Sequence, residues 1–153
     1  MRRGILAAAA VCVLALAGCG GSSEPSLSAF KTGFVSEKTA FRKLGLDLQQ
    51  EITGAKSKTD AQLATEINAL AVRASNQADG LAKLNPPAKF KAQLSKLVAG
   101  FRSVSTDLRS IATAAVKHDA ASARTATMTL LTDAAKVKSA DDAITQGLGL
   151  KAS

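Results

Sequence analysis

The sequence predicts an all-α protein whose helices form an antiparallel, up-down-up-down four-helix bundle. Alanine, which has the highest helix propensity, is frequent, and glycine and proline gather mostly at a few junctions. Apolar residues recur every three or four positions from residue 27 to residue 148, which is the spacing of a helix with one buried face. The 153 residues include 5 Phe but no Trp or Tyr, so we expect a narrow core between closely spaced helices.

The first predicted helix begins at Leu27 and ends near Gly54. Glu37 is the single polar residue in its apolar pattern, and we expect Gly54 to follow the helix in a left-handed C′ conformation. Residues 56–58 then form a polar loop. The expected core positions are Leu27, Phe30, Phe34, Phe41, Leu44, Leu48 and Ile52.

The second predicted helix has a clear start and a clear end. Thr59 and Gln62 have the spacing of a capping box, and Asp60 suits the positive end of the helix dipole. Pro86 and Pro87 end the helix, because proline disfavours the helical conformation in the residue before it. The expected core positions are Leu63, Ile67, Leu70, Ala74, Gln77, Leu81 and Leu84.

The third predicted helix has the most regular apolar pattern. We expect Asn85 to cap its start, and Lys117 and His118 suit the negative end of its dipole. The expected core positions are Phe90, Leu94, Leu97, Phe101, Val104, Leu108, Ile111 and Ala115.

The fourth predicted helix follows almost at once, with Asp119 as its cap. Its pattern is weaker than that of the third helix, and we expect its last turn to fray near Gly147 and Gly149. The expected core positions are Ala123, Thr127, Leu130, Leu131, Ala134, Val137, Ile144 and Leu148. The bundle therefore covers residues 27–150.

A secretory leader precedes the predicted bundle. Arg2 and Arg3 give a positive start, and residues 5–17 form an uncharged apolar run. That run is shorter than the roughly 20 residues of a membrane-spanning helix and has the length of a signal-peptide core. We therefore expect residues 1–18 to be a signal peptide with a helix of its own, ahead of the bundle.

The leader ends in Leu16-Ala17-Gly18-Cys19, which resembles the lipobox of bacterial lipoproteins. The resemblance implies that the Cys19 thiol receives diacylglycerol, that the Gly18–Cys19 bond is cut, and that acylated Cys19 becomes the new N-terminus. Two acyl chains anchor a protein stably, whereas one gives only marginal binding. The alternative is a chance cysteine after an ordinary signal peptide.

The second cysteine, Cys12, is a poor rival for lipidation, because Ala9 stands where the lipobox has leucine. Cys12 is discarded with the leader, so the mature domain has no disulfide and depends on packing alone for its stability. Apart from the acyl chains on Cys19, the sequence predicts no cofactor.

Residues 19–26 form the lipidated cysteine and a flexible tether. Residues 20–26 reach at most about 25 Å, at roughly 3.5 Å each, so the bundle stays close to the extracytoplasmic face of its membrane. In a host with two membranes, the absence of Asp at position 20 favours the outer one, by resemblance to known sorting rules.

The charge balance suggests an acidic neighbour. The chain has 20 Lys+Arg against 12 Asp+Glu, and removal of Arg2 and Arg3 with the leader leaves 18 against 12. Without aromatic residues for stacking, nucleic acid has little support as a partner. Anionic lipid headgroups, an acidic cell-wall polymer or a protein partner fit better.

The predicted topology sorts these charges between the two ends of the bundle. The end next to the anchor collects a basic patch that faces the membrane or only aids solubility: Lys31, Lys83, Lys89, Lys91 and Lys151. The other end, either a docking surface or a solvated cap, carries Lys56, Lys58, Lys117, His118 and Arg124 beside Glu51, Asp60 and Asp119.

Glu37 and Gln77 form a candidate polar pair in the core. They occupy core-type positions on neighbouring antiparallel helices and could line a polar pocket for a small ligand. The alternatives are a hydrogen-bonded pair that fixes the register of the helices, or a Glu37 side chain that extends to solvent.

The residues for metal binding, haem binding or nucleophilic catalysis are too few. His118 is the one histidine, no cysteine follows Cys19, and Met128 has no matching histidine on a facing core position. The serines and threonines are scattered, and the histidine lies at a loop. We therefore expect no metal site and no enzymatic activity.

Residues 81–87, Leu-Ala-Lys-Leu-Asn-Pro-Pro, together with the lipobox and the Ala/Thr-rich helices, resemble small lipoproteins of high-GC Gram-positive (actinobacterial) type. This resemblance implies no catalytic residue. The leading hypothesis is a non-enzymatic binding module anchored in the cell envelope. The alternative is a carrier or sensor of a small apolar ligand, held between the first and fourth helices near Phe30, Phe34 and Phe41.

Overall fold

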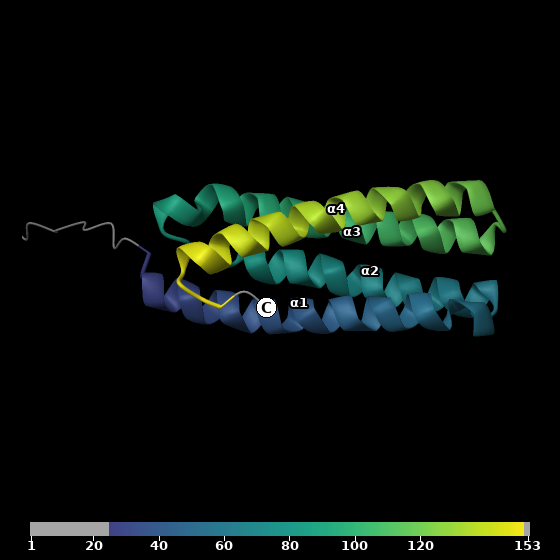
Figure 1. Ribbon diagram of the computed structural model, residues 1–153, viewed down its shortest axis with the longest axis horizontal. Coiled ribbons are helices and arrows are strands. Elements are labelled where there is room, and N and C mark those ends of the chain that lie inside the picture. The colour runs from purple at the N-terminus through teal and green to yellow at the C-terminus, as the bar shows by residue number, and fades with distance from the viewer. Residues whose placement is uncertain (1–24, 152–153) are drawn as a thin grey trace, which may run out of the picture.

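The computed structural model describes residues 25–151. These residues form four long helices and one short 3-10 helix, which run alternately up and down one long axis (Figure 1). The elements are α1 (Leu27–Gly54), η1 (Ala55–Ser57), α2 (Asp60–Ala82), α3 (Ala88–Val116) and α4 (Ala120–Gly147). This confirms the predicted all-α, antiparallel four-helix bundle. The predicted signal peptide, Cys19 and all of the tether before Pro25 lie outside the described residues.

Two predicted helix caps at one end of the bundle are confirmed. The Thr59 side chain accepts a hydrogen bond from the backbone N–H of Gln62. In return, the Gln62 side chain accepts one from the backbone N–H of Thr59 at 3.0 Å, so both bonds of the capping box are present. The Asp119 carboxylate caps α4 and accepts from the backbone N–H of Ser122 at 3.0 Å. Each cap satisfies backbone donors that the first turn of a helix leaves without partners.

The predicted cap of α3 is wrong. Pro87, not Asn85, is the N-cap residue, and α3 has no side-chain capping bond. The two prolines extend the chain, so that Asn85 stands three residues before the first helical residue, too far back to reach the free amides of that turn.

Helices α3 and α4 both end in a Schellman motif. After α4, Leu150 donates its N–H to the carbonyl of Thr145 at 3.0 Å, and Gly149 has φ +62°. After α3, Asp119 donates to Ala114 at 2.9 Å, and the left-handed residue is His118, with φ +53°. The end of α4 is therefore closed by hydrogen bonds where we predicted fraying.

The end of α1 also differs from the prediction. Gly54 is the last residue of the helix, with a right-handed φ of −81°, and the chain continues directly into η1. Because the 3-10 helix takes up the last carbonyls of α1, no left-handed residue is needed at this position.

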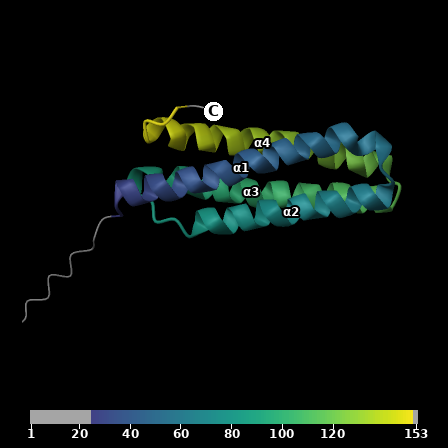
Figure 2. The ribbon, with the colours of Figure 1, turned by 90° about the horizontal axis from the view of Figure 1, so that it is seen from below.

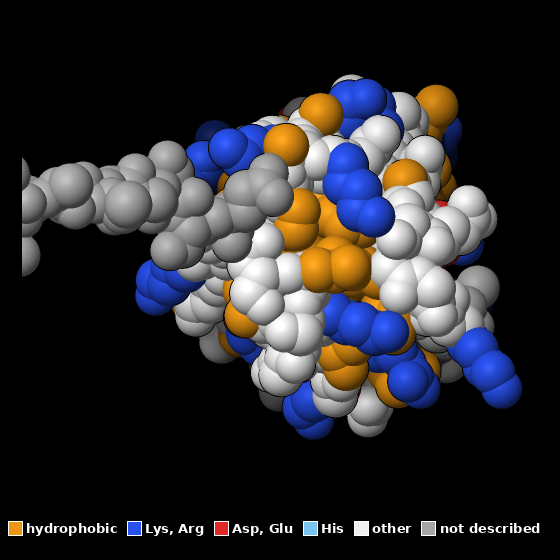
Figure 3. All heavy atoms as spheres, turned by 90° about the vertical axis from the view of Figure 1, so that its left-hand side faces the viewer, with side chains coloured by type: hydrophobic (Ala, Val, Ile, Leu, Met, Phe, Trp, Pro, Cys, Tyr) orange, Lys and Arg blue, Asp and Glu red, His pale blue; other side chains and the backbone are white. Residues whose placement is uncertain are grey.

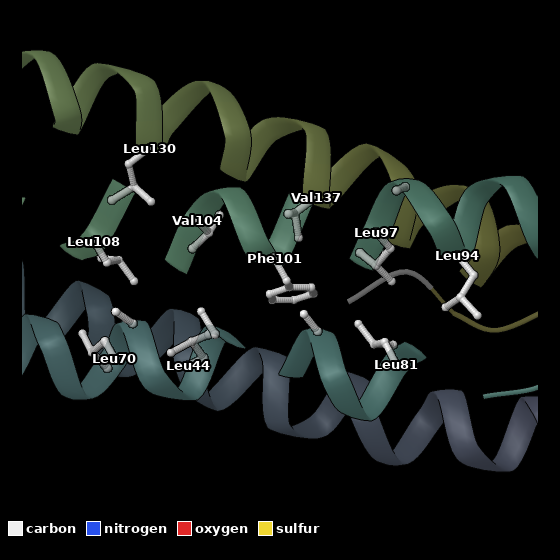
Figure 4. Packing of buried hydrophobic residues seen from close by; sticks show 14 of the residues in the cluster. Leu44, Leu70, Leu81, Leu94, Leu97, Phe101, Val104, Leu108, Leu130 and Val137 are labelled. Carbon is white, nitrogen blue, oxygen red and sulfur yellow. The ribbon is translucent and has the colours of Figure 1, made fainter. Parts of the chain in front are cut away.

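The core is continuous and draws on all four helices. Leucines, Phe101 and Val137 point toward one another between α2, α3 and α4 (Figure 4). The five phenylalanines lie between the start of α1 and the middle of the bundle: Phe30 and Phe90 have ring centroids 5.3 Å apart, and Phe41 meets Phe101 edge-on at 5.0 Å. Toward the other end the core consists of aliphatic residues with many alanines, such as Ala64.

Helices α1 and α4 meet at one end only. Figure 1 shows α4 crossing toward α1 near its C-terminal end and lying away from it at the opposite end. Ile52 and Leu131, both predicted in the core, are 62% and 66% exposed as a result. Leu27, Thr127 and Ala134 are also exposed, contrary to prediction.

The buried face of α4 is offset from the one predicted. Leu130 faces the core and Leu131 does not, while Asp133 and Asp141 take positions that the apolar pattern did not assign to the core. This offset follows from the way α4 crosses α3 (Figure 1).

The first turn of α1, the α2–α3 connection and the end of α4 lie at the same end of the bundle in two views (Figure 1, Figure 2). We call it the entry end, because the residues before Pro25 join the helices there, and we call the opposite end, formed by η1 and the α3–α4 connection, the far end. All buried apolar residues of the described part lie between Phe30 and Leu148, so residues 25–151 contain a core of their own. In this part of the chain, no helix is long and apolar enough to span a bilayer.

Candidate functional site

The entry end carries a group of lysines with no acidic residue among them. The structure brings together the five that the topology predicted, here called the entry-end lysines: Lys31, Lys83, Lys89, Lys91 and Lys151. The segments that form this end, residues 25–31, 80–91 and 145–151, contain no Asp or Glu. Figure 3, which looks onto this end, shows Lys and Arg side chains around its surface and almost no acidic ones.

The entry-end lysines are largely available for contact with a partner. Four of them are exposed, and among the described residues none of the five takes part in an ion pair. Lys31, which is half-buried, donates to the carbonyl of Leu148 at 3.3 Å, at the negative end of the α4 dipole. The Lys89 ammonium lies 4.8 Å from the centre of the Phe90 ring, a cation–π distance.

Apolar side chains lie among these lysines. Figure 3 shows hydrophobic atoms in the middle of the entry end, with blue side chains around them. Leu27 is 47% exposed. A groove of about 620 Å³ opens on the flank of this end between the end of α2 and the first half of α3. Its lining is mainly apolar with a cationic edge: Ala82, Leu84, Pro86, Lys91, Leu94, Ser95, Val98, Ala99 and Arg102.

The far end has a different electrostatic character, because acids there contact bases. Lys58 contacts both Glu51 and Glu66, and hydrogen bonds to these two carboxylates raise the pKa of Lys58. His118 Nδ1 lies 2.6 Å from Asp60 Oδ2. The hydrogen bonds that cap α4 lower the pKa of Asp119.

Glu37 and Gln77 form a hydrogen-bonded pair between α1 and α2. The Gln77 amide donates to the Glu37 carboxylate at 2.7 Å and to the Glu37 backbone carbonyl at 3.1 Å. Gly80 leaves room for this pair, since a Cβ atom there would lie 2.6 Å from a carboxylate oxygen. An open groove of about 410 Å³ lies beside the pair, with Lys43 and Arg73 among its lining residues.

A second polar network, between α1 and α4, was not predicted from the sequence. Lys38 donates to the Asp141 carboxylate at 2.7 Å and to the Thr145 hydroxyl at 2.9 Å. The Lys38 and Asp141 side chains are 12% and 9% exposed, and Thr145 is fully buried. The one signal in the sequence is that Asp141 stands four residues after Val137, on the same helix face.

Two buried carboxylates lie in the seam between α3 and α4. Asp107 and Asp133 are each 9% exposed, and Asp107 Oδ2 has no hydrogen-bond partner. Burial raises the pKa of Asp107, and the nearby charge of Asp133 raises it further. Asp133 forms an ion pair with Lys136, whose ammonium lies 2.6 Å from its carboxylate.

Groups that could bind a metal ion do not converge in residues 25–151. These residues contain no cluster of three or more His, Cys, Asp or Glu side chains. His118 is 77% exposed at the far end and contacts Asp60. Comparison of the chain with protein-family models, curated proteins and solved structures found no significant match.

Proposed function

We propose that the protein is a membrane-anchored lipoprotein of the cell envelope, whose helical bundle acts as a non-enzymatic binding module. The observation that carries the proposal is the lipobox ending at Cys19, followed after a short tether by α1 from Leu27. Such an arrangement attaches a folded domain to lipid through one residue and keeps it outside the cytoplasm.

The geometry of the bundle is consistent with this attachment. The tether can reach at most about 25 Å at roughly 3.5 Å per residue, so the entry end stays near the bilayer. Helices of 28 residues are about 42 Å long at 1.5 Å per residue, so the far end is attached to the anchor only through the length of the bundle. The far end and the sides therefore offer surfaces to a protein or an acidic wall polymer.

The anchoring is tested by replacing the acylated residue. The full chain and its Cys19→Ala variant are produced in a bacterium that processes lipoproteins, and membrane fractions are analysed by intact-mass spectrometry. We expect the unchanged protein to begin at an acylated Cys19 and the variant to lack both the acyl mass and the cut after Gly18.

Cys12→Ala serves as the matched control, because this cysteine lies within the same leader but has no lipobox before it. It should leave processing unchanged. A mature chain that begins at any residue other than acylated Cys19 would refute the proposed anchoring.

The carrier or sensor alternative places a small apolar ligand between α1 and α4. Phe30 and Phe34 are 2% and 1% exposed, and Phe41 packs against the ring of Phe101. The Phe30 and Phe34 rings fill the space near the entry end. An open groove of about 360 Å³ remains between α1 and α4 beside Phe41, but charged residues make up much of its lining: Arg42, Lys138, Asp141 and Asp142. Such a lining does not suit an apolar ligand, so the binding-module proposal has the better support.

A further inference from the structure

We propose that the entry end is a docking surface for an anionic phospholipid bilayer, which holds the bundle upright on its membrane. This inference rests on the proposed lipoprotein function for the presence of a bilayer nearby. It adds a second contact, made by folded residues rather than by the acyl chains. Lipid-anchored proteins commonly combine acylation with a basic patch in this way.

Uncompensated charge is the first argument. The three described segments that form the entry end carry the five entry-end lysines and no acid; Glu24, directly before the first segment, lies outside the described residues. A lysine near an anionic membrane surface strengthens binding roughly fivefold, the equivalent of about 1 kcal/mol. Several such lysines on one small surface therefore give measurable affinity even without an anchor.

The arrangement of the lysines is the second argument. They come from the first turns of α1, the α2–α3 connection, the first turn of α3 and the residue that follows the Schellman motif of α4, so they surround one end of the bundle (Figure 3). A flat anionic surface contacts all of them only when the bundle axis stands close to the membrane normal. Exposed Leu27 lies at the same end and suits the depth of the lipid headgroups.

The far end provides the contrast that favours lipid at the entry end. Lys58 is engaged by two glutamates, and Asp60 and Asp119 add negative charge beside Lys56 and Lys117. An anionic surface would gain less there, because it would also meet these acids. The chain that leads back to the proposed anchor joins the entry end, which therefore faces the bilayer.

The binding test uses residues 20–153, which contain the whole described core and no cysteine. This fragment is sedimented with vesicles of phosphatidylcholine alone and with vesicles that contain 30% phosphatidylglycerol, at low and high salt. We expect binding to the anionic vesicles only, and loss of that binding at high salt, because exposed charges are then screened.

Two charge-matched variants locate the contact. In the first, four exposed entry-end lysines become glutamine: Lys83, Lys89, Lys91 and Lys151. In the second, four exposed lysines elsewhere become glutamine: Lys43, Lys56, Lys96 and Lys117. We expect the first variant to bind about six-hundredfold more weakly and the second to change by less than about threefold, since each lysine at the contact contributes roughly fivefold.

The upright orientation is tested with single cysteines that carry a polarity-sensitive dye. Ala88 and Ala120 are both exposed alanines at the first position of a helix, one at the entry end and one at the far end. On anionic vesicles the dye at Ala88→Cys should shift its emission, and the dye at Ala120→Cys should not.

The docking proposal is overturned by equal loss of binding in the two glutamine variants, by equal dye shifts, or by tighter binding to soluble polyglycerol phosphate than to vesicles. These results are independent of acylation, because the fragment lacks Cys19. Failure of the docking proposal and failure of the proposed anchoring are therefore separate outcomes.

Discussion

The entry half and the far half of the bundle differ in how they are packed. Toward the entry end, Phe30 packs against Phe34 and Phe90, and α4 lies close to α1. Toward the far end, the core is aliphatic and rich in alanine. Ile52 and Leu131 are exposed in this half, where α1 and α4 lie farther apart. Aromatic side chains bury more apolar area than alanine, so the entry half contributes more to stability.

The two halves also differ in surface charge, and here the entry half is the less favourable one. In the part of the chain that the structure describes, the entry end carries five lysines without an acid, whereas the far end pairs Lys58 with two glutamates and uses Asp119 as a helix cap. Like charges on one surface repel one another, which disfavours the compact state. The better-packed half can tolerate such a surface, which is consistent with the proposal that the entry end contacts an anionic bilayer.

The largest expected effect is loss of the aromatic packing. Phe34 is 1% exposed, and Phe34→Ala should lower the free energy of unfolding by about 4 kcal/mol, through lost burial and the cavity left behind. In the far half, Leu131→Ala should change it by less than about 0.5 kcal/mol, because Leu131 is 66% exposed. Urea denaturation followed by circular dichroism measures both. A loss above 2 kcal/mol for Leu131→Ala would mean that α1 and α4 close together at the far end.

The next largest effect concerns the buried contact between α1 and α4. Lys38→Met leaves the carboxylate of Asp141 buried without its partner, and should lower the free energy of unfolding by about 3 kcal/mol. The double variant Lys38→Met/Asp141→Leu should recover most of that loss, since no charge then remains buried. Lys138→Met is the matched control and should have little effect, because its partner Asp142 lies on the surface of the same helix. A double variant as unstable as Lys38→Met would contradict this account.

The sequence predicted the helices and the N-caps of α2 and α4 because these depend on neighbouring residues. Thr59 and Gln62 stand three residues apart, and the fold brings nothing distant into their capping box. The buried positions of Asp107 and Asp141 could not be predicted in this way, because a charged residue normally marks an exposed face. Their burial depends on how α4 crosses α3 and on Lys38, about a hundred residues away from Asp141.

The grouping of the entry-end lysines was predictable for a different reason. In an antiparallel bundle with short connections, chain order alone determines which loops share an end, so Lys31, Lys89 and Lys151 fall together without any knowledge of side-chain positions. The same argument brought Glu37 near Gln77. It could not show that Lys58 is engaged by acids while the entry-end lysines are not, because pairing depends on side-chain geometry.

The buried carboxylate of Asp107 in the far half should respond to pH. Because its pKa is raised in the folded protein, the folded state binds the proton more readily than the unfolded state does. This stabilising contribution is complete below the ordinary pKa of 3.8 and is lost as the pH rises through the raised, folded value. At pH 7, Asp107→Asn should therefore raise the free energy of unfolding by about 1.5 kcal/mol, because it removes the charge of a buried carboxylate whose Oδ2 atom has no hydrogen-bond partner.

Thermal unfolding between pH 3 and pH 7 measures this effect. The advantage of Asp107→Asn over the unchanged protein should shrink as the pH falls. Asp142→Asn, at a carboxylate paired with Lys138 on the surface, should show no such advantage at pH 7. A destabilised Asp107→Asn at pH 7 would show that the ionised carboxylate is held by a favourable interaction.

The smallest effect compares the same helix ending at the two ends of the bundle. The Schellman motif of α4 uses Gly149, and that of α3 uses His118, in nearly the same left-handed conformation. A side chain in this conformation is strained, so Gly149→Ala should lower the free energy of unfolding by about 1 kcal/mol.

At the end of α3, His118→Gly should raise the free energy of unfolding by about 0.5 kcal/mol, since relief of the strain outweighs the greater freedom that glycine gives the unfolded chain. His118→Ala keeps the strain but loses the contact with Asp60, so the expected order of stability in urea is Gly, then His, then Ala at position 118. If alanine there proved more stable than glycine, the left-handed conformation at position 118 would carry no net strain, because both variants lack the contact with Asp60.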